Sequence, residues 1–384
     1  SELDALGVKV DKLDARVAVL EERIGGWKFS GNFRFTAKWA DDDNFYGVDQ
    51  DSNWKVDRFR WNIVKYVDDK VTLNVRLEGA GGDSLLVKRA YATIQFPWDV
   101  IAQVGRFPLD WEGDFYATDH AGYNMNDAYI TDYDPLATAV WFKKPFEMGS
   151  FEMFVAHNED GVIETDGDTV YKSDYYQYGA RLAFDFNENF AAAVNYVNYD
   201  FYEEGNNFST LWGDIIVNFN ENVAFKGQYF TQNNDWDYEG NAWKAIVTFS
   251  QDMLKFTDLW VEYAQIDEGF VFPNADPYAW ALGETSPYLH DDYFGYYVDN
   301  DVNILNIVAK QKWNDQWWTY VRYMSVDADS DWHSYKAYTA SVRYNYTPNL
   351  WFELGYDKID LDHEWRASRW EGDDMIWFRT TVNF

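Results

Sequence analysis

The sequence predicts an all-β fold: a transmembrane antiparallel β-barrel of about 18 strands, with about 16 as the alternative, preceded by a short N-terminal α-helical coiled-coil stalk. Aromatic residues make up 20% of the chain, yet its mean hydropathy is −0.51. Apolar residues recur with a period of two, and short turns alternate with long acidic loops. In a barrel strand, apolar residues that face lipid alternate with polar residues that face the lumen, so their hydropathies cancel in any window. This alternation explains why a chain rich in aromatic residues is hydrophilic on average. No segment approaches the ~18 consecutive apolar residues of a transmembrane helix.

The first element is the stalk, predicted over residues 1–26, and the barrel domain follows over residues 27–384. A heptad repeat runs from residue 3 to residue 24 and ends at two glycines, as expected past a helix C-terminus. Lys9 and Arg16 stand at g positions and Asp14 and Glu21 at the following e positions, which favours ion pairs between parallel chains. A lone amphipathic helix is the alternative, and the heptad leaves the number of chains open. The predicted coiled-coil core consists of Leu3, Leu6, Val10, Leu13, Val17, Leu20 and Ile24.

From Trp27 onward the period-two pattern predicts strands. Short turns separate them, and Phe-Asn-Glu-Asn occurs in two of these turns, at 186–189 and 219–222. Long acidic loops lie between successive short turns, which is typical of outer-membrane barrels with periplasmic turns and outer loops. Weak strands near Val100 and Asp301 leave the lower strand number open, and a soluble sandwich or propeller is the rival fold. An even strand number places both termini in the periplasm.

The chain ends on an amphipathic strand whose apolar face finishes at Phe384. This ending resembles the assembly signal of bacterial outer-membrane barrels, so the barrel assembly machinery and outer-membrane lipid or lipopolysaccharide are expected partners. Tryptophans near strand ends, Trp141, Trp260 and Trp351 among them, predict aromatic girdles at the membrane interface.

Most strand arginines fall on the face opposite to the apolar one. An arginine facing lipid at mid-bilayer would cost about 2–4 kcal/mol, so these residues are predicted to line the lumen. Some are expected to pair with Glu78, Glu262 and Glu353. The predicted basic wall consists of Arg34, Arg58, Arg60, Arg76, Arg89, Arg181, Arg322, Arg343 and Arg379, with Lys226 and Lys244 on the same face.

The loop at 108–135 is predicted to fold into the barrel and narrow it, the alternative being a loop over the outer mouth. Its carboxylates would face the arginine wall, and opposed rows of charge select solutes in such pores. Aromatic residues in this loop indicate a sugar-specific channel as an alternative function. The predicted constriction residues are Asp110, Trp111, Glu112, Asp114 and Asp119.

Other function classes find little support in the sequence. A net charge of −33 excludes nucleic acid as a partner, because phosphate binding needs a basic surface. The chain has no cysteine and five scattered histidines, so no metal site and no cofactor are predicted. No nucleophile motif is present, so the protein is not predicted to be an enzyme. The negative charge of the outer loops predicts a mild cation preference at low salt.

The stalk, the glycine pair and the aromatic barrel ending in Phe384 together resemble the surface-layer-homology (SLH) domain porins of diderm Firmicutes, the OmpM type. The resemblance implies a homotrimer in the outer membrane with its stalk in the periplasm. It also implies a link to peptidoglycan through an SLH domain upstream of the stalk, which this sequence does not include.

Three functions therefore stay open at this point. The first is a porin for passive diffusion of small hydrophilic solutes and ions. The second is a non-conducting membrane anchor or tether, and the third is a substrate-specific channel, for example for sugars.

Overall fold

The computed structural model describes residues 25–40, 52–80, 85–109, 111, 113–115, 138–158, 161–165, 168–172, 175–201, 207–234, 240–272, 296–297, 301–328, 334–361 and 374–384. The predicted coiled-coil core from Leu3 to Ile24 lies outside these residues. The same holds for three predicted constriction residues, Asp110, Glu112 and Asp119.

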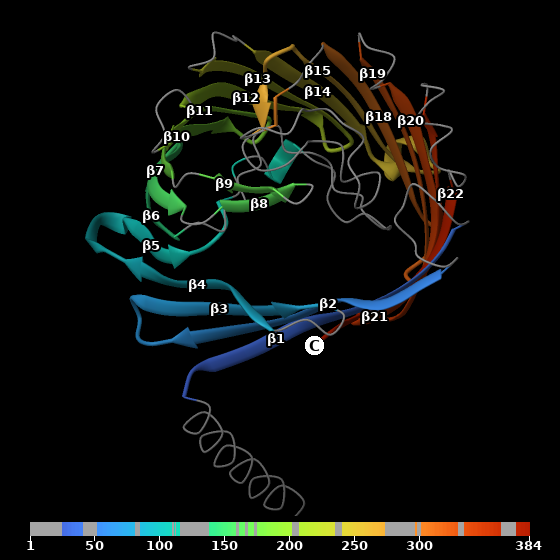
Figure 1. Ribbon diagram of the computed structural model, residues 1–384, viewed down its shortest axis with the longest axis horizontal. Coiled ribbons are helices and arrows are strands. Elements are labelled where there is room, and N and C mark those ends of the chain that lie inside the picture. Colours follow the sequence, from blue (N-terminus) through green and yellow to red (C-terminus); the bar gives the residue numbers. More distant parts are fainter. Residues whose placement is uncertain are drawn as a thin grey trace, which may run out of the picture.

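The chain folds into a closed antiparallel barrel of 18 strands, which confirms the larger of the two predicted strand numbers (Figure 1). Successive barrel strands pair in chain order, and β1 pairs with β22 to close the ring. The barrel strands are β1 (Trp27–Trp39), β2 (Ser52–Tyr66), β3 (Val71–Gly79), β4 (Leu86–Gln95), β5 (Ile101–Arg106), β6 (Thr138–Phe146), β7 (Gly149–Asn158), β10 (Tyr175–Asn187), β11 (Phe190–Phe201), β12 (Phe208–Asn220), β13 (Val223–Asn234), β14 (Asn241–Phe249), β15 (Asp258–Ile266), β18 (Val302–Lys312), β19 (Trp317–Ala328), β20 (Tyr335–Thr347), β21 (Leu350–Leu361) and β22 (Asp374–Asn383).

Few of the described elements stand outside the barrel wall. Two separate two-stranded sheets are formed by β8 (Gly161–Thr165) with β9 (Asp168–Lys172) and by β16 (Val271–Phe272) with β17 (Tyr296–Tyr297). The helical turns are η1 (Pro97–Asp99), η2 (Gly113–Phe115) and α2 (Gln251–Leu254). Among the described residues no helix has the length and hydropathy of a membrane span.

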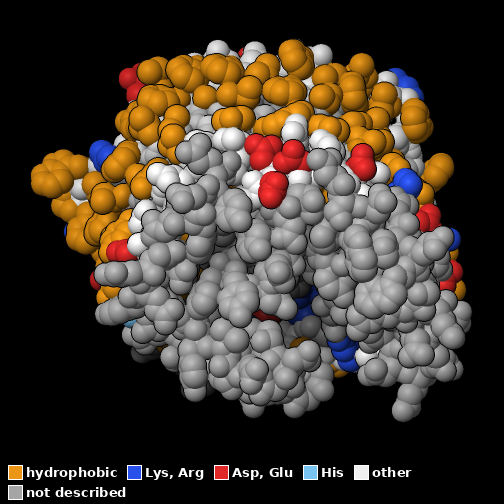
Figure 2. Space-filling model, turned by 45° about the horizontal axis from the view of Figure 1, so that its top comes forward, with side chains coloured by type: hydrophobic (Ala, Val, Ile, Leu, Met, Phe, Trp, Pro, Cys, Tyr) orange, Lys and Arg blue, Asp and Glu red, His pale blue; other side chains and the backbone are white. Residues whose placement is uncertain are grey.

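Side chains alternate between two unlike faces along each barrel strand. On β7, Phe151 and Met153 are exposed on the outer face, whereas Glu152 and Phe154 are buried on the inner face. Hydrophobic side chains cover the part of the outer barrel surface that is in view in Figure 2. The fold therefore has the apolar exterior and polar interior that a membrane barrel requires.

Asparagine and aspartate side chains build the short turns. The Asn187 side-chain oxygen accepts a hydrogen bond from the backbone N–H of Asn189 at 2.8 Å, and Asn220 does the same for Asn222. Such side chains mimic a backbone turn, which explains the repeated turn sequence. The predicted hairpin device is thus confirmed in both copies.

The seam between the first and last strands is held by the C-terminal residue. The backbone N–H of Gly31 donates to the carbonyl oxygen of Phe384 at 2.6 Å, and the N–H of Phe384 donates back to Gly31 at 3.0 Å. A Cβ atom on Gly31 would lie 2.3 Å from Cζ of Phe384, so only glycine leaves room for this ring. The role of Phe384 as an assembly signal stays a prediction, but its ring packs at the barrel seam.

Candidate functional site

The inner face of β22 and β1–β4 carries a group of arginines that we call the arginine row. Cross-strand register fixes their common face, since Arg34 stands opposite Arg58 and Arg76 stands opposite Arg89. Side chains of directly opposed residues point to the same side of a sheet. The arginine row consists of Arg34, Arg58, Arg60, Arg76, Arg89 and Arg379, all of them in the predicted basic wall.

Carboxylates neutralise only part of the arginine row. Arg34 pairs with Asp57 at 2.8 Å, and Arg60 pairs with Glu78 at 2.8 Å. Arg58 lies between these pairs and makes no ion pair within 4.0 Å with another described residue. Among the described residues, Arg58 therefore contributes a positive charge to the row that no ion pair neutralises.

The other predicted wall arginines lie elsewhere around the barrel. Arg343 on β20 is 3.7 Å from Glu353 on β21, and Arg322 on β19 is buried on the inner face. Arg181 on β10 pairs with Asp214 at 3.1 Å. The predicted ion pairs of Glu78, Glu262 and Glu353 with inner-face basic residues are all confirmed. Glu78 pairs with Arg60, Glu353 pairs with Arg343, and Glu262 lies 3.3 Å from Lys244.

The start of the loop at 108–135 runs along the inner wall. We call its described residues, 108, 109, 111 and 113–115, together with Phe107 before them, the inward segment. Phe107 packs against Tyr91 of β4 with ring centroids 5.5 Å apart, and it is almost fully buried. The helical turn η2 lies beneath β13 and β14 (Figure 1). The predicted inward fold is thus observed for the described residues of this loop.

Three basic side chains bind main-chain carbonyls of the inward segment. Arg181 donates to the carbonyl of Trp111 at 3.0 Å, Lys226 donates to that of Asp114, and Lys244 donates to that of Phe115 at 2.9 Å. The three donors belong to β10, β13 and β14. We call this set the cation clamp. A hydrogen bond from a charged donor contributes about 1.5–3 kcal/mol of stability, so the cation clamp favours the position of the segment on the inner wall.

Lys244 is the most enclosed member of the cation clamp. Its side chain and that of Glu262, 3.3 Å away, are both fully buried. The indole N–H of Trp260 donates to Glu262 at 2.8 Å. A buried ion pair needs such additional hydrogen bonds to offset its desolvation.

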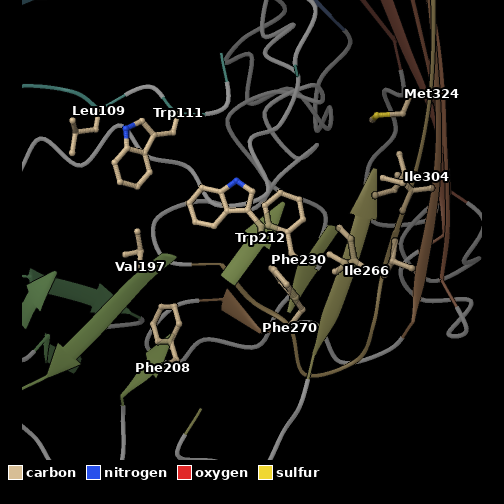
Figure 3. Close-up of a cluster of buried hydrophobic side chains, with 14 of the residues drawn as sticks. Leu109, Trp111, Val197, Phe208, Trp212, Phe230, Ile266, Phe270, Ile304 and Met324 are labelled. Atoms are coloured by element: carbon tan, nitrogen blue, oxygen red, sulfur yellow. The ribbon is translucent and has the colours of Figure 1, made fainter. Parts of the chain in front are cut away.

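Aromatic side chains hold the inward segment from the long-loop side. The ring of Trp111 lies 5.4 Å from that of Phe154 and 6.2 Å from that of Trp212, measured between centroids. Trp212 in turn stacks on Phe230, and Phe270 completes the group (Figure 3). This cluster sits on the inner face of the barrel, where it fills part of the lumen.

The structure places the two described constriction residues, Trp111 and Asp114, beside basic residues of β10 and β13. Asp114 is exposed and lies beside Lys226, a residue of the predicted basic face. In Figure 1 the strands β2 and β3 run along the opposite side of the barrel from η2. The turn η2 therefore lies across the lumen from β2 and β3, whereas Phe107 at the start of the inward segment contacts Tyr91 on β4, the strand of Arg89.

The predicted girdle position of three tryptophans is wrong. Trp141 stands opposite the inward-facing Gln103 and Phe154, and only 9% of it is exposed. Trp260 and Trp351 also share the inner face with the neighbouring residues Glu262 and Glu353. The girdle was predicted because these tryptophans lie near strand ends. Whether a side chain faces lipid or lumen depends instead on its position in the alternation along the strand. Counting in steps of two from Lys143 would have placed Trp141 correctly.

Among the described residues no group of three or more His, Asp or Glu is arranged to hold a metal ion.

Comparison with known proteins gives a likeness of fold. No family model and no curated protein matches the sequence. The structure resembles OccK11 (OpdR) of Pseudomonas aeruginosa, with a TM-score of 0.62, 9% identity and coverage of 93% of this chain and 96% of that chain. It also resembles OpdQ of Pseudomonas aeruginosa, with a TM-score of 0.59, 12% identity and coverage of 93% and 98%. For OccAB3 of Acinetobacter baumannii the TM-score is 0.58, the identity 9% and the coverage 94% and 100%. These neighbours are outer-membrane porins, and at such identities the likeness shows the barrel fold.

Proposed function

We propose that the protein is an outer-membrane porin through which small hydrophilic solutes and ions diffuse passively. The observation that carries this proposal is a closed 18-stranded barrel with a charged inner face and an apolar outer face. Barrels of about 16–18 strands are wide enough to leave an aqueous channel. The fold shared with outer-membrane porins supports the same function and an outer-membrane location.

In this proposal the inward segment narrows the channel. The cation clamp keeps η2 on one side, and the arginines of β2 and β3 line the other. Opposed charges of this kind orient dipolar solutes, with ion preference set by the less neutralised side. If Asp110, Glu112 and Asp114 together face the passage, replacing them with their amides changes conductance and selectivity. Unchanged conductance would place this loop outside the conducting path.

The finer parts of the proposal concern assembly. We propose a homotrimer whose N-terminal coiled coil lies in the periplasm and links, as in the SLH-domain porins, to a peptidoglycan-binding domain. The heptad repeat and the resemblance to that family support it. Heat-sensitive migration on gels and conductance steps that come in threes are the expected signs of a trimer.

Recording from single channels in planar bilayers tests the central claim. Purified, folded barrel should insert and give large ohmic conductance steps. A folded barrel that stays silent would instead favour the anchor or tether function. A small conductance that solutes of one class block would favour a substrate-specific channel.

A further inference from the structure

A cavity of about 710 Å³ lies between the inward segment and the wall built by β5, β6, β7 and β10. Its wall residues, such as Gln103, Ser150 and Asp185, stand in the halves of these strands that lead to the short turns. A solute that has passed the inward segment from the long-loop side therefore meets this cavity next. Its volume falls within the roughly 300–1,000 Å³ typical of small-molecule sites.

Two indole side chains border the cavity. Trp141 projects from β6, and its indole N–H makes no hydrogen bond with any described residue although the side chain is about nine-tenths buried. Trp111 belongs to the inward segment, and its indole N–H donates to Glu152 at 2.9 Å. The cavity thus combines aromatic surface with one unsatisfied hydrogen-bond donor.

The charges nearest to the two indoles are paired. Lys143 lies 2.9 Å from Glu152, and Arg181 lies 3.1 Å from Asp214. Each pair is neutral as a whole, so it attracts a free ion weakly. The carboxylate oxygens nevertheless have more acceptor sites than these contacts use. Asp114 and Asp185 line the cavity as well, and their carboxylates add further acceptors for hydroxyl groups.

We propose that this cavity binds a neutral polyhydroxylated solute, a monosaccharide or a short oligosaccharide, during its passage. A sugar ring has an apolar C–H face that packs against an indole and hydroxyl groups at its edge. These hydroxyls can donate to Glu152 and Asp185 and accept from the free indole N–H of Trp141. The inference rests on the proposed porin function and names a solute class for it.

Current recordings with maltotriose test the proposal. Maltotriose should produce brief interruptions of the open-channel current that saturate with concentration, and polyethylene glycol of matched size should not. Trp141→Ala should weaken maltotriose binding about tenfold, the equivalent of losing one aromatic contact. Glu152→Gln, which keeps the shape but not the charge, should also weaken it. Trp318→Ala is the matched control, because Trp318 faces the lumen from β19, away from the cavity.

Each outcome bears on the proposal separately from the porin function. If the channel conducts potassium chloride and maltotriose causes no interruptions of the current, the proposed sugar site is refuted and the proposed porin function is not. Interruptions that Trp141→Ala leaves unchanged place the binding elsewhere. Interruptions by lysine and not by maltotriose reassign the cavity to cationic solutes. If the barrel does not conduct, calorimetry of maltotriose with the detergent-solubilised protein and the Trp141→Ala variant decides the site alone, and absence of binding there refutes it.

Discussion

Replacing Lys244 with methionine tests whether the cation clamp holds the inward segment. The substitution keeps the length of the side chain and removes the ammonium group that binds both Glu262 and the carbonyl of Phe115. A hydrogen bond from a charged donor contributes about 1.5–3 kcal/mol. The ratio of clamped to released segment should therefore fall roughly tenfold to a hundredfold, since about 1.4 kcal/mol corresponds to a factor of ten.

Single-channel recording measures this release directly. We expect Lys244→Met channels to show excess open-channel noise and excursions to a higher conductance, because the segment leaves the inner wall part of the time. Removing one partner of a buried ion pair also destabilises the fold, by about 3–5 kcal/mol. The double variant with Glu262→Gln removes the carboxylate charge left behind, and it should recover stability while keeping the noise.

Lys55→Met is the matched control for this experiment. Lys55 stands opposite Thr36 on the inner face of β2, and β2 runs across the barrel from η2, so the variant removes the same charge from the lumen at a distance from the cation clamp. Its conductance should shift without added noise. Equal noise in the wild type and in folded Lys244→Met channels would show that the clamp does not hold the segment, and the reasoning would fail.

Three further predictions follow from the seam, the arginine row and the stalk. Gly31→Ala should slow barrel closure, seen as loss of the heat-modifiable gel band, whereas Gly213→Ala, whose new Cβ has no neighbour nearer than 3.8 Å, should fold normally. Arg58→Gln should raise the cation preference measured as a reversal potential in a potassium chloride gradient, and strong anion selectivity at all salt concentrations would contradict the role given to the acidic loops. Leu13→Asp with Leu20→Asp should separate the stalk helices and leave the barrel oligomer intact, and labelling of the stalk from outside intact cells would refute its periplasmic position.

Much of the barrel was determined locally by the sequence. The strands follow from a side-chain period of two, which depends only on the extended backbone. The lumen position of Arg58 or Arg76 follows from the cost of placing an arginine in lipid. The turn at 186–189 follows from the asparagine side chain, which closes the turn by itself.

Contacts between distant segments were decided by the tertiary structure. The sequence predicted that Lys244 and Glu262 face the lumen. The register of β14 against β15 brings their charged groups to 3.3 Å from each other, so that they form an ion pair. Which wall the inward segment contacts depends on the carbonyl groups of Trp111, Asp114 and Phe115. Every residue has a backbone carbonyl group, so the sequence does not show which ones are used. The cavity beside Trp141 exists only because a segment and four strands together line it. The sequence by itself therefore determined the barrel and the inward direction of its strand arginines. The shape of the passage required the fold, because it arises from groups that the chain brings together across more than a hundred residues.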